Sequence, residues 1–384
     1  MSNSSTYTGK HEIQSSDGLS GGGTTQKTLL KISYAPDFSK NNPYQRQLYD
    51  KLECLGINLE GIDRRKIFLP TALKRDTDIL HLHWLHTYFR AKSAVGSRLK
   101  VVKFLSGLII LKLRGTKIVW TAHNLKNHEN MYPFSDKVCT LGVSKLADAI
   151  IVHSYAAKSE LCQTFRLDNT EKVSVVPHGN YVEAYENGIS RQEARKQLEI
   201  PESSRVLLFF GMIRWYKGVP ELIDVFKELR SKNTYLVIAG RFRNVDKDLA
   251  DLIQKKAKGN QKIKLVPEFI PEEEVQTYMN ACDVVVFPYR KLLTSGALIL
   301  AMSFRRACVA PKLGCMEEIL DEAGGVFYDP SSSDSLVQAL ENVVQKENDL
   351  PRMGEHNYQL AMEWSWETVA QMTLALYQSY VEDA

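Results

Sequence analysis

The sequence lacks most of the features that mark an exported, metal-dependent or nucleic-acid-binding protein. Its six cysteines include no close-spaced pair and no metal-ligand spacing, and no apolar segment of a secretory signal stands near the beginning. The net charge is only +4, which is too small to favour nucleic acid as the main partner. No Asp-x-Asp motif follows a predicted strand. We therefore expect a cytoplasmic protein with reduced thiols, no bound metal and no nucleic acid.

The first 26 residues have few apolar side chains and are rich in Ser, Thr and Gly. Such a segment buries too little apolar surface to offset the entropy of ordering, and we expect a disordered tail. The whole chain is 44% apolar, which suffices for packed cores, and its 384 residues predict about two domains. The polar stretch 181–190 has no apolar periodicity, and we expect the interdomain linker there.

Beyond this tail, short apolar runs alternate with helix-forming segments. The expected strands are 29–34, 79–84, 117–122, 149–153 and 173–177 in the first half, and 206–210, 235–239, 263–266, 284–287, 308–310 and 326–328 in the second. Helices are expected between them, for example at 44–55, 219–230, 247–258, 272–281, 296–304 and 316–322. This alternation predicts an α/β protein with parallel sheets, arranged as two Rossmann-like domains facing across a cleft.

The loop after the apolar run 206–210 has the composition of an anion-binding site. Gly211 allows a sharp turn at the carboxyl end of the strand, where open α/β sheets bind their ligands. Arg214 and Lys217 follow, just before the next predicted helix. Two cations beside a helix N-terminus suit an anion such as a diphosphate. The alternative is two solvated cations on an ordinary turn.

A second turn of this kind follows the strand predicted at 284–287. Thr294 or Ser295 can cap the helix that begins near Gly296, and the free backbone N–H groups at the helix start can bind a phosphate. Gly296 would let that phosphate approach closely. Simple capping is the alternative, and the two roles are compatible.

Several short motifs stand in a characteristic order along the chain. They are Asp-Ile-Leu-His-Leu-His-Trp (78–84), Trp-Thr-Ala-His-Asn (120–124), Val-Pro-His-Gly (176–179), the loop 209–218, Leu-Val-Ile-Ala-Gly (236–240), Phe-Pro-Tyr (287–289), Thr-Ser-Gly (294–296) and Trp-Ser-Trp (364–366). Each is weak alone. Together, from about residue 31 to the end of the chain, they resemble the GT-B glycosyltransferases, close to the large family 4 group and its relatives that build bacterial polysaccharides.

The resemblance implies a division of labour between two domains. An acceptor-binding Rossmann-like domain would occupy 27–183, a nucleotide-sugar-binding one 184–362, and a helix within 363–384 would cross back to the first domain. The reaction would move a hexose, mannose or glucose, from a UDP- or GDP-linked sugar to a saccharide or lipid-linked saccharide acceptor in polysaccharide or glycolipid biosynthesis. The nucleotide-diphosphate sugar would be the donor substrate, with no cofactor and no metal requirement.

The resemblance also assigns roles to particular residues. Gly211, Arg214, Lys217 and the segment from Thr294 to Gly296 would bind the diphosphate and neutralise it as it leaves. His123, at the end of a predicted strand, would contact the donor sugar. A purely structural histidine is the alternative for that position.

One departure from the family concerns carboxylates. Many family 4 enzymes carry two glutamates near the phosphate-binding turn, one for the sugar and one for the ribose, and Leu292 and Leu300 stand at these places here. Glu317 or Glu318, at the start of a later helix, is a candidate replacement for one of them. The departure leaves the donor and the usual retaining stereochemistry open, because some relatives with a similar Thr-Ser-Gly segment resemble inverting β-mannosyltransferases.

An inverting reaction needs a base that accepts the proton of the acceptor hydroxyl. Asp37, in the loop after the first predicted strand, and Glu129, in the loop that follows His123, are the candidates. The double-glycine loop common in family 4 near the position of Asp37 is missing. A turn residue is the simpler interpretation of Asp37.

The segment 98–114 would be apolar around most of a helix, with cations toward its ends. It is too short and too charged to span a bilayer. One interpretation is an interfacial segment that places the protein peripherally on an anionic membrane surface, on its inner face, beside the acceptor site. The other is a buried helix between two strands, and both stay open.

His81 and His83 alternate along one predicted strand and share a face, where packing is favoured over a metal site.

Two other functions stay open. A GT-B nucleotide-sugar epimerase would need carboxylates in the cleft, which Leu292 and Leu300 do not supply. A non-catalytic homologue that binds a saccharide or nucleotide would have no need for His123 together with the two loop cations.

Overall fold

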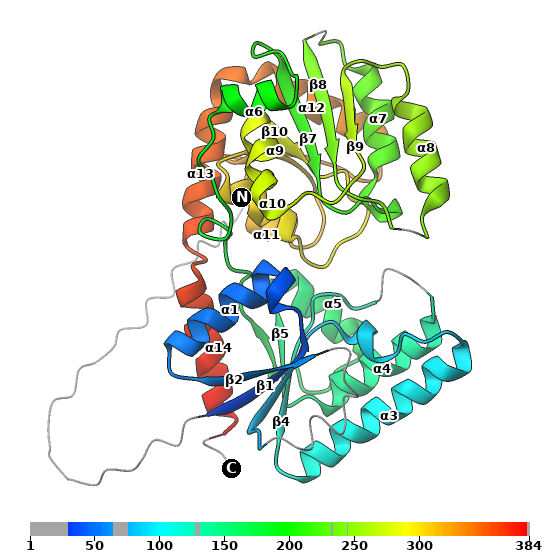
Figure 1. Cartoon of the computed structure of the whole chain (residues 1–384), viewed down its shortest axis with the longest axis vertical. Helices are drawn as coiled ribbons and strands as arrows, with labels where there is room; N and C mark the ends of the chain where they lie inside the picture. Colours follow the sequence, from blue (N-terminus) through cyan, green and yellow to red (C-terminus); the bar gives the residue numbers. More distant parts are fainter. Residues whose placement is uncertain (1–29, 64–75, 127–130, 232, 244, 382–384) are drawn as a thin grey trace, which may run out of the picture.

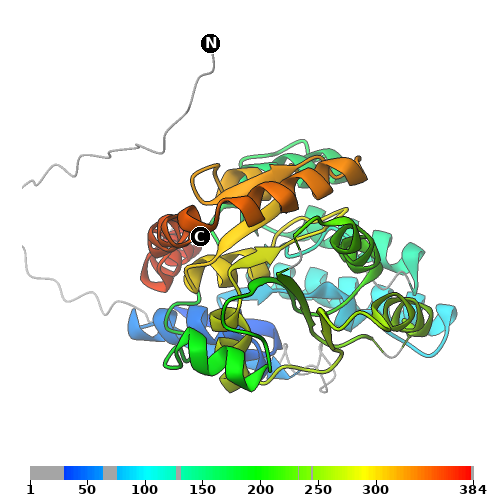
Figure 2. The same ribbon diagram turned by 90° about the horizontal axis from the view of Figure 1, so that it is seen from above.

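The computed structural model describes residues 30–63, 76–126, 131–231, 233–243 and 245–381. These residues form two α/β halves stacked along the long axis of the molecule (Figure 1). Seen from above, one half lies in front of the other (Figure 2). The fold class predicted from the alternation is confirmed, because each half is a parallel sheet packed against helices. The tail predicted at 1–26 and the candidate base Glu129 lie outside the described residues.

The N-terminal half is built on a sheet whose described strands run in the order β2-β1-β3-β4-β5-β6. These strands are β1 (Lys31–Asp37), β2 (Asn58–Asp63), β3 (Ile79–Leu82), β4 (Lys117–Thr121), β5 (Ala149–Val152) and β6 (Val173–Val175). The helices of this half are α1 (Pro43–Cys54), α3 (Ala94–Leu113), α4 (Pro133–Leu146) and α5 (Tyr155–Phe165), with short 3-10 turns η1 (Ser39–Asn41) and η2 (Leu85–Tyr88).

The C-terminal half has the strand order β12-β11-β10-β7-β8-β9 within the described residues. Its strands are β7 (Arg205–Phe210), β8 (Thr234–Ala239), β9 (Ile263–Val266), β10 (Val284–Val286), β11 (Ala307–Pro311) and β12 (Gly325–Tyr328). Its helices are α6 (Arg191–Gln197), α7 (Val219–Glu228), α8 (Lys247–Ala257), α9 (Val275–Ala281), α10 (Gly296–Ser303), α11 (Met316–Ile319), α12 (Ser333–Gln345) and α13 (Leu350–Met362), with η3 (Trp215–Lys217), η4 (Glu272–Glu274) and η5 (Glu347–Asp349).

The strand orders fix where a ligand can bind. In the C-terminal sheet the order reverses between β7 and β10, and in the N-terminal sheet between β1 and β3. Open α/β sheets form a crevice beyond the carboxyl ends of the strands at such a reversal, because the following helices leave toward opposite faces. We therefore expect the loops after β1, β3, β7 and β10 to border a ligand-binding crevice.

The strands form because their side chains are buried on both faces of the sheet. Alternate residues of β3 enter two separate cores: Leu80 and Leu82 pack with residues of α3, α4 and α5, whereas Ile79 packs with residues of α1 and the C-terminal helix α14 (Trp366–Ser379). Val206–Phe209 of β7 are fully buried. This continuous apolar character is typical of parallel sheets covered on both sides.

The strand β2 was not predicted. Its sequence, Asn-Leu-Glu-Gly-Ile-Asp, has polar residues at half of its positions because it is an edge strand that pairs only with β1 within the described chain. An edge strand needs fewer apolar side chains than a central one. The pairing aligns Asp63, at the end of β2, with Asp37 at the end of β1.

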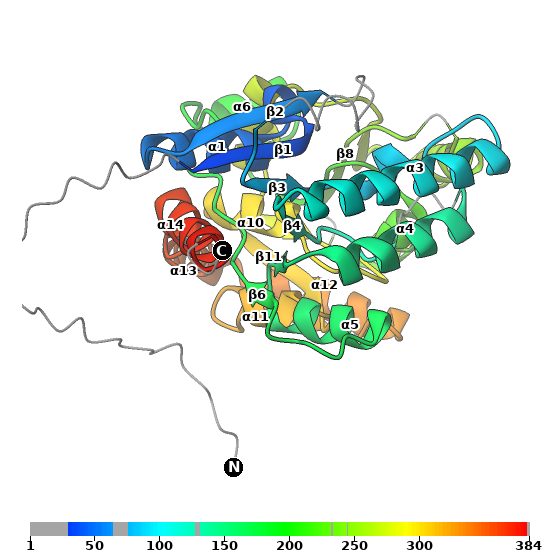
Figure 3. The same cartoon turned by 90° about the horizontal axis from the view of Figure 1, so that it is seen from below.

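The helix α14 packs against the N-terminal half although it ends the chain. In Figure 3 it lies beside α1, on the far side of the sheet from α3 and α4. Trp366, Val369 and Tyr377 are buried in the same core as α1. A Cβ at Gly179 would lie 2.4 Å from the Trp366 ring, so only glycine permits this packing.

The helix α3, which contains most of segment 98–114, has one buried face and one exposed face. It connects β3 to β4, and its inner face, including Val101, Phe104 and Leu108, is buried against the sheet and α4. Its outer face exposes apolar side chains, among them Leu99 and Leu113. Of the described helices, none combines the length and the apolar character needed to cross a bilayer.

Candidate active site

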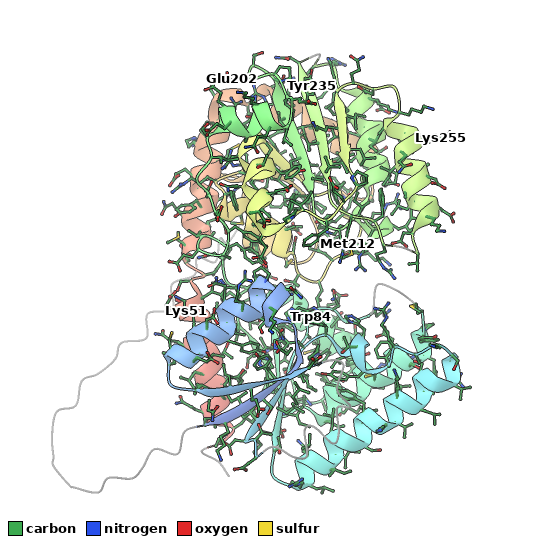
Figure 4. The ribbon with its side chains drawn as sticks, viewed as in Figure 1. Lys51, Trp84, Glu202, Met212, Tyr235 and Lys255 are labelled. Carbon is green, nitrogen blue, oxygen red and sulfur yellow. The ribbon has the colours of Figure 1, made fainter. Side chains whose placement is uncertain are left out.

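A cleft of about 850 Å³ lies between the two halves. Its N-terminal wall comes from the carboxyl ends of β1, β3 and β4, and its C-terminal wall from the loops after β7 and β8. Figure 4 shows Trp84 and Met212 on opposite sides of this gap. The cleft therefore sits at the reversal points of both sheets, where ligands of open α/β sheets bind.

A smaller pocket of about 100 Å³ adjoins the cleft, because Asn124 lines both. It is lined by Lys217, Tyr289 and the segment from Thr294 to Gly296. The structure thus brings Lys217 and the predicted helix start into one pocket. Arg214 lines the neighbouring cleft instead.

Glycines hold the loop after β7 against its neighbours. Gly218 has φ +64°, and a Cβ there would lie 2.0 Å from the carbonyl oxygen of Pro288. Because the loops after β7 and β10 touch so closely, the Lys217 ammonium lies 5.1 Å from the centre of the Tyr289 ring. Gly211 also has a positive φ, +107°, as a sharp turn at the strand end requires.

The pocket is electrostatically prepared for an anion. Lys217 is half-buried, and burial together with the nearby Arg214 guanidinium lowers the pKa of Lys217 to about 8. Among the described residues, no carboxylate lies within ion-pair distance of its ammonium. A cation with little water and no counter-charge favours binding of an anion.

The start of α10 also lines this pocket. Ser295 caps the helix, since its side chain accepts the backbone N–H of Leu298 at 3.3 Å. Gly296 faces a tight space, where a Cβ would lie 3.2 Å from the Tyr181 hydroxyl. The helix start offers backbone N–H groups and the positive end of the helix dipole to an anion. Capping and phosphate binding are thus compatible here.

The positions of the missing glutamates are apolar in the fold as well. Leu300 is buried in the C-terminal core, and Leu292 lines the small pocket. Glu317 and Glu318 line neither cavity. Glu318 instead accepts the backbone N–H groups of Tyr155, at 2.7 Å, and of Ala156 at the start of α5.

The contact of Glu318 with α5 joins the two halves of the molecule on one side of the cleft. On another side Arg46 of α1 forms an ion pair of 2.8 Å with Glu272. In this structure Glu318 therefore contributes a contact between the two halves.

Asp37 lines the cleft, and its Oδ1 accepts the Ser39 backbone N–H at 2.9 Å and hydroxyl at 2.7 Å. This is the geometry of a turn residue, as the simpler interpretation had it. The other oxygen, Oδ2, accepts no hydrogen bond from the described residues. Asp63 lines the cleft beside it. Asp63 was not predicted as a site residue, because the strand β2 was not recognised from the sequence.

His123 follows β4, is 8% exposed and lines the cleft. The Trp84 ring stacks on it, with ring centres 4.4 Å apart and planes 9° from parallel. Phe38 lies 5.4 Å from Trp84, so the N-terminal wall carries an aromatic surface of the kind on which sugar rings pack. Burial and neighbouring imidazoles hold the pKa of His123 well below its usual range. His123 is therefore neutral near pH 7.

Two further site residues were missed from the sequence. Arg241 follows β8 and adds a cation to the C-terminal wall. Trp84 ends a recognised motif, but nothing in the motif shows that its ring faces the cleft. His81 and His83 are both fully buried, and no group of three or more metal-ligating side chains occurs in the described part of the chain.

A family model described as "Glycosyl transferases group 1" matches residues 190–360. The chain is 27% identical over 354 residues to a GDP-mannose:glycolipid 4-beta-D-mannosyltransferase of Xanthomonas campestris pv. campestris, an alignment that covers 88% of this chain and 92% of that protein. It is 24% identical over 364 residues to a D-inositol 3-phosphate glycosyltransferase of Corynebacterium urealyticum, covering 85% and 80% of the two chains.

Solved structures share the fold. A sucrose-phosphate synthase from Thermosynechococcus elongatus superimposes with a TM-score of 0.72 at 16% identity, over 93% of this chain and 100% of that chain. HepE from Anabaena, in complex with UDP and glucose, also gives 0.72, at 15% identity, over 91% and 100%. The group 1 model falls on the half that holds Lys217 and α10, and the full-length relatives extend over both halves. The chain is a glycosyltransferase with the GT-B fold, and its residues 190–360 match the group 1 glycosyltransferase family.

Proposed function

We propose that the protein transfers mannose from GDP-mannose to a lipid-linked saccharide. The observation that carries the proposal is that Lys217, without a carboxylate partner among the described residues, lines one pocket together with the start of α10. The mannosyltransferase relative, whose printed name includes GDP-mannose and a glycolipid, supports the donor and the acceptor class. The aromatic wall formed by Trp84 and Phe38 supports a sugar in the adjoining cleft.

The chemistry follows from where charge develops. When the bond between the sugar C1 and the phosphate oxygen breaks, negative charge accumulates on the departing diphosphate. Lys217 and the α10 N–H groups would receive that charge, with Arg214 and Arg241 on the cleft side. Because side-chain cations supply the positive charge, we expect full activity in the presence of a metal chelator.

We further propose that transfer inverts the configuration of the sugar, with Asp37 as the base. Asp37 lines the cleft, as Trp84 does, and its Oδ2 accepts no hydrogen bond from the described residues. In an inverting displacement the acceptor hydroxyl attacks C1 from the face opposite the diphosphate and gives its proton to a carboxylate. Glu129 stays a second candidate outside the described residues.

A thermal-shift screen of GDP, UDP and ADP tests the donor. A nucleotide at 100 times its dissociation constant adds about 2.7 kcal/mol to the free energy of unfolding. We expect GDP to give the largest stabilisation and GDP-mannose to be consumed only when a lipid-linked saccharide is present. A larger effect of UDP would reject GDP-mannose, and no effect of any nucleotide would reject the transferase proposal.

A membrane surface is the proposed location of the acceptor. The outer face of α3 carries five exposed apolar residues at successive spacings of four, three, seven and four residues, with exposures from 46% to 83%: Val95, Leu99, Val102, Ile109 and Leu113. A helix that is apolar on all sides is expected to be covered on all sides.

The positive charge around this apolar face favours an anionic bilayer as the surface that covers it. Between Asp78 and Glu129 the sequence contains nine Lys or Arg residues and no acidic residue. Arg98 and Lys103, both exposed, flank the apolar stripe of α3. Each such cation contributes about 1 kcal/mol at an anionic leaflet. We therefore propose peripheral binding to the cytoplasmic face of the membrane.

Vesicle flotation tests this location. The protein should float with vesicles that contain phosphatidylglycerol and stay below with pure phosphatidylcholine, and high salt should release it. Leu99→Asp with Ile109→Asp should abolish flotation. Val245→Asp, on an equally exposed apolar residue of the C-terminal half, is the matched control and should float as the wild type does. Equal flotation of both variants would contradict the proposal.

A further inference from the structure

A chain of hydrogen bonds runs beneath the cleft from α1 to His123. The Tyr49 hydroxyl of α1 contacts Nε2 of His83, and Nδ1 of His83 lies 3.1 Å from Nε2 of His123. Tyr49 is 3% exposed and His83 fully buried, so no water competes for these groups. The chain ends at the cleft wall, because His123 lines the cavity.

All three groups are neutral near pH 7. Burial holds the pKa of His83 and of His123 well below the usual range of histidine, and it raises the pKa of Tyr49 well above that of a free phenol. Each imidazole therefore carries one proton, on one of its two nitrogens. Which nitrogen carries it is set by the hydrogen bond that the other nitrogen makes.

The direction of the chain follows from Tyr49. The Tyr49 hydroxyl has one hydrogen-bond partner among the described residues, Nε2 of His83. Because a buried O–H needs an acceptor and the Tyr49 hydroxyl has no other partner among the described residues, it donates its proton to His83. Nε2 of His83 therefore accepts, and the proton of His83 is on Nδ1.

The same logic continues to the cleft. The Nδ1 proton of His83 is donated to Nε2 of His123, which leaves the proton of His123 on Nδ1. Nδ1 of His123 has no hydrogen-bond partner among the described residues, and it is not one of their buried unsatisfied atoms, so it is open to the cleft. A neutral imidazole in this state donates a hydrogen bond to a ligand and accepts none.

We propose that Tyr49 and His83 are positioning residues that fix His123 as a hydrogen-bond donor to a sugar oxygen in the cleft and prevent it from acting as the base. The identity of the ligand rests on the proposed function, whereas the proton positions do not. The proton of the acceptor hydroxyl must then go to a carboxylate, for which Asp37 is the candidate in the described cleft.

Nitrogen NMR of the full chain labelled with [15N]histidine tests the proton positions without substrate. Protonated and unprotonated ring nitrogens have well-separated chemical shifts, and comparison with His123→Asn assigns the signals of His123. We expect Nδ1 of His123 to be the protonated nitrogen at pH 7, and Tyr49→Phe to shift the signals of both His83 and His123. A proton on Nε2 of His123, or unchanged signals in Tyr49→Phe, would overturn the proposal.

Kinetics provide an independent readout. Asn at position 123 places an NH2 donor close to the site of Nδ1 but has no basic nitrogen, so His123→Asn should keep kcat within about tenfold of the wild type, whereas His123→Ala should lose about 10²–10³-fold. Nucleotide affinity should be unchanged in both variants. If Asn is as inactive as Ala while GDP still binds, His123 is the base and the proposal is wrong. Failure of GDP to bind the wild type would instead reject the proposed function alone.

Discussion

The two walls of the cleft differ in the charge of their side chains. The C-terminal wall gathers cations, Lys217, Arg214 and Arg241, around a helix start. The N-terminal wall rests on buried histidines that are all neutral, joined to tyrosines and tryptophans. Both walls occupy the same place in their sheets, beyond the carboxyl ends of the strands where the order reverses. The difference therefore comes from side chains and not from the fold.

The contrast suggests which kind of group each wall serves. A departing diphosphate gains negative charge during the reaction, and fixed cations stabilise it. A sugar and an acceptor hydroxyl carry no charge, and for them the positions of individual protons decide the geometry. The two walls should consequently respond to pH in opposite ranges, the N-terminal one to acid and the C-terminal one to base.

The largest predicted effect is acid destabilisation of the N-terminal half. Burial lowers the pKa of His81 to about 3, of His153 to about 4 and of His178 to about 3. In the unfolded chain a histidine has a pKa of about 6.5. Below that pH the unfolded chain binds protons that the buried histidines of the folded chain do not bind. Each such histidine then removes up to about 1.4 kcal/mol of stability per pH unit until the pH reaches its folded pKa.

Urea unfolding at pH 7, 6 and 5, followed by tryptophan fluorescence, measures this effect. The free energy of unfolding should fall by several kcal/mol between pH 6.5 and 5 by the same reasoning. His81→Gln removes one of the titrating groups and should make the slope shallower. A free energy of unfolding that does not change over this pH range would contradict the conclusion that these buried histidines stay neutral in the folded protein.

The second prediction concerns the cationic wall. Lys217→Ala should lower kcat for sugar transfer by about 10²–10³-fold, or roughly 3–4 kcal/mol of barrier, because one charge opposite the leaving diphosphate is lost. Lys227→Ala, on the exposed side of α7, is the matched control and should have wild-type activity. Full activity of Lys217→Ala would remove the basis for the diphosphate assignment.

The comparison also shows what the sequence could and could not predict. The central strands and the loop cations were recognisable, because continuous apolar runs followed by Gly211 or by Thr294 leave a strong local pattern. Asp63 was missed because an edge strand has no such run. The chain from Tyr49 through His83 to His123 joins α1, β3 and the end of β4, and no local pattern reports which side chains meet across three elements.

The same limit explains Glu318. Its position at the start of α11 suggested a donor-binding carboxylate, but the contact that it makes depends on how α5 of the other half approaches. Trp84 and Arg241 are similar cases, since only the packing of the two halves turns them toward a common cleft. Contacts between distant elements are set by the assembled fold.

The smallest predicted effect is a loss of nucleotide affinity at basic pH. The free ammonium of Lys217 has a pKa of about 8, and a bound diphosphate raises it. Affinity should therefore be constant below pH 8 and fall by up to about tenfold per pH unit above it. Calorimetry with GDP at pH 7.5, 8.5 and 9.5 measures the change. Lys217→Arg, whose charge persists in this range, should remove the pH dependence, and a constant wild-type affinity would argue against the low pKa.

The most direct measurement is a crystal structure of the protein with GDP-mannose. We predict the diphosphate in the small pocket, within hydrogen-bond distance of the Lys217 ammonium and of the backbone N–H groups at the start of α10, with the mannose reaching toward His123. A diphosphate bound elsewhere in the cleft, away from both Lys217 and α10, would contradict the division of roles between the two walls.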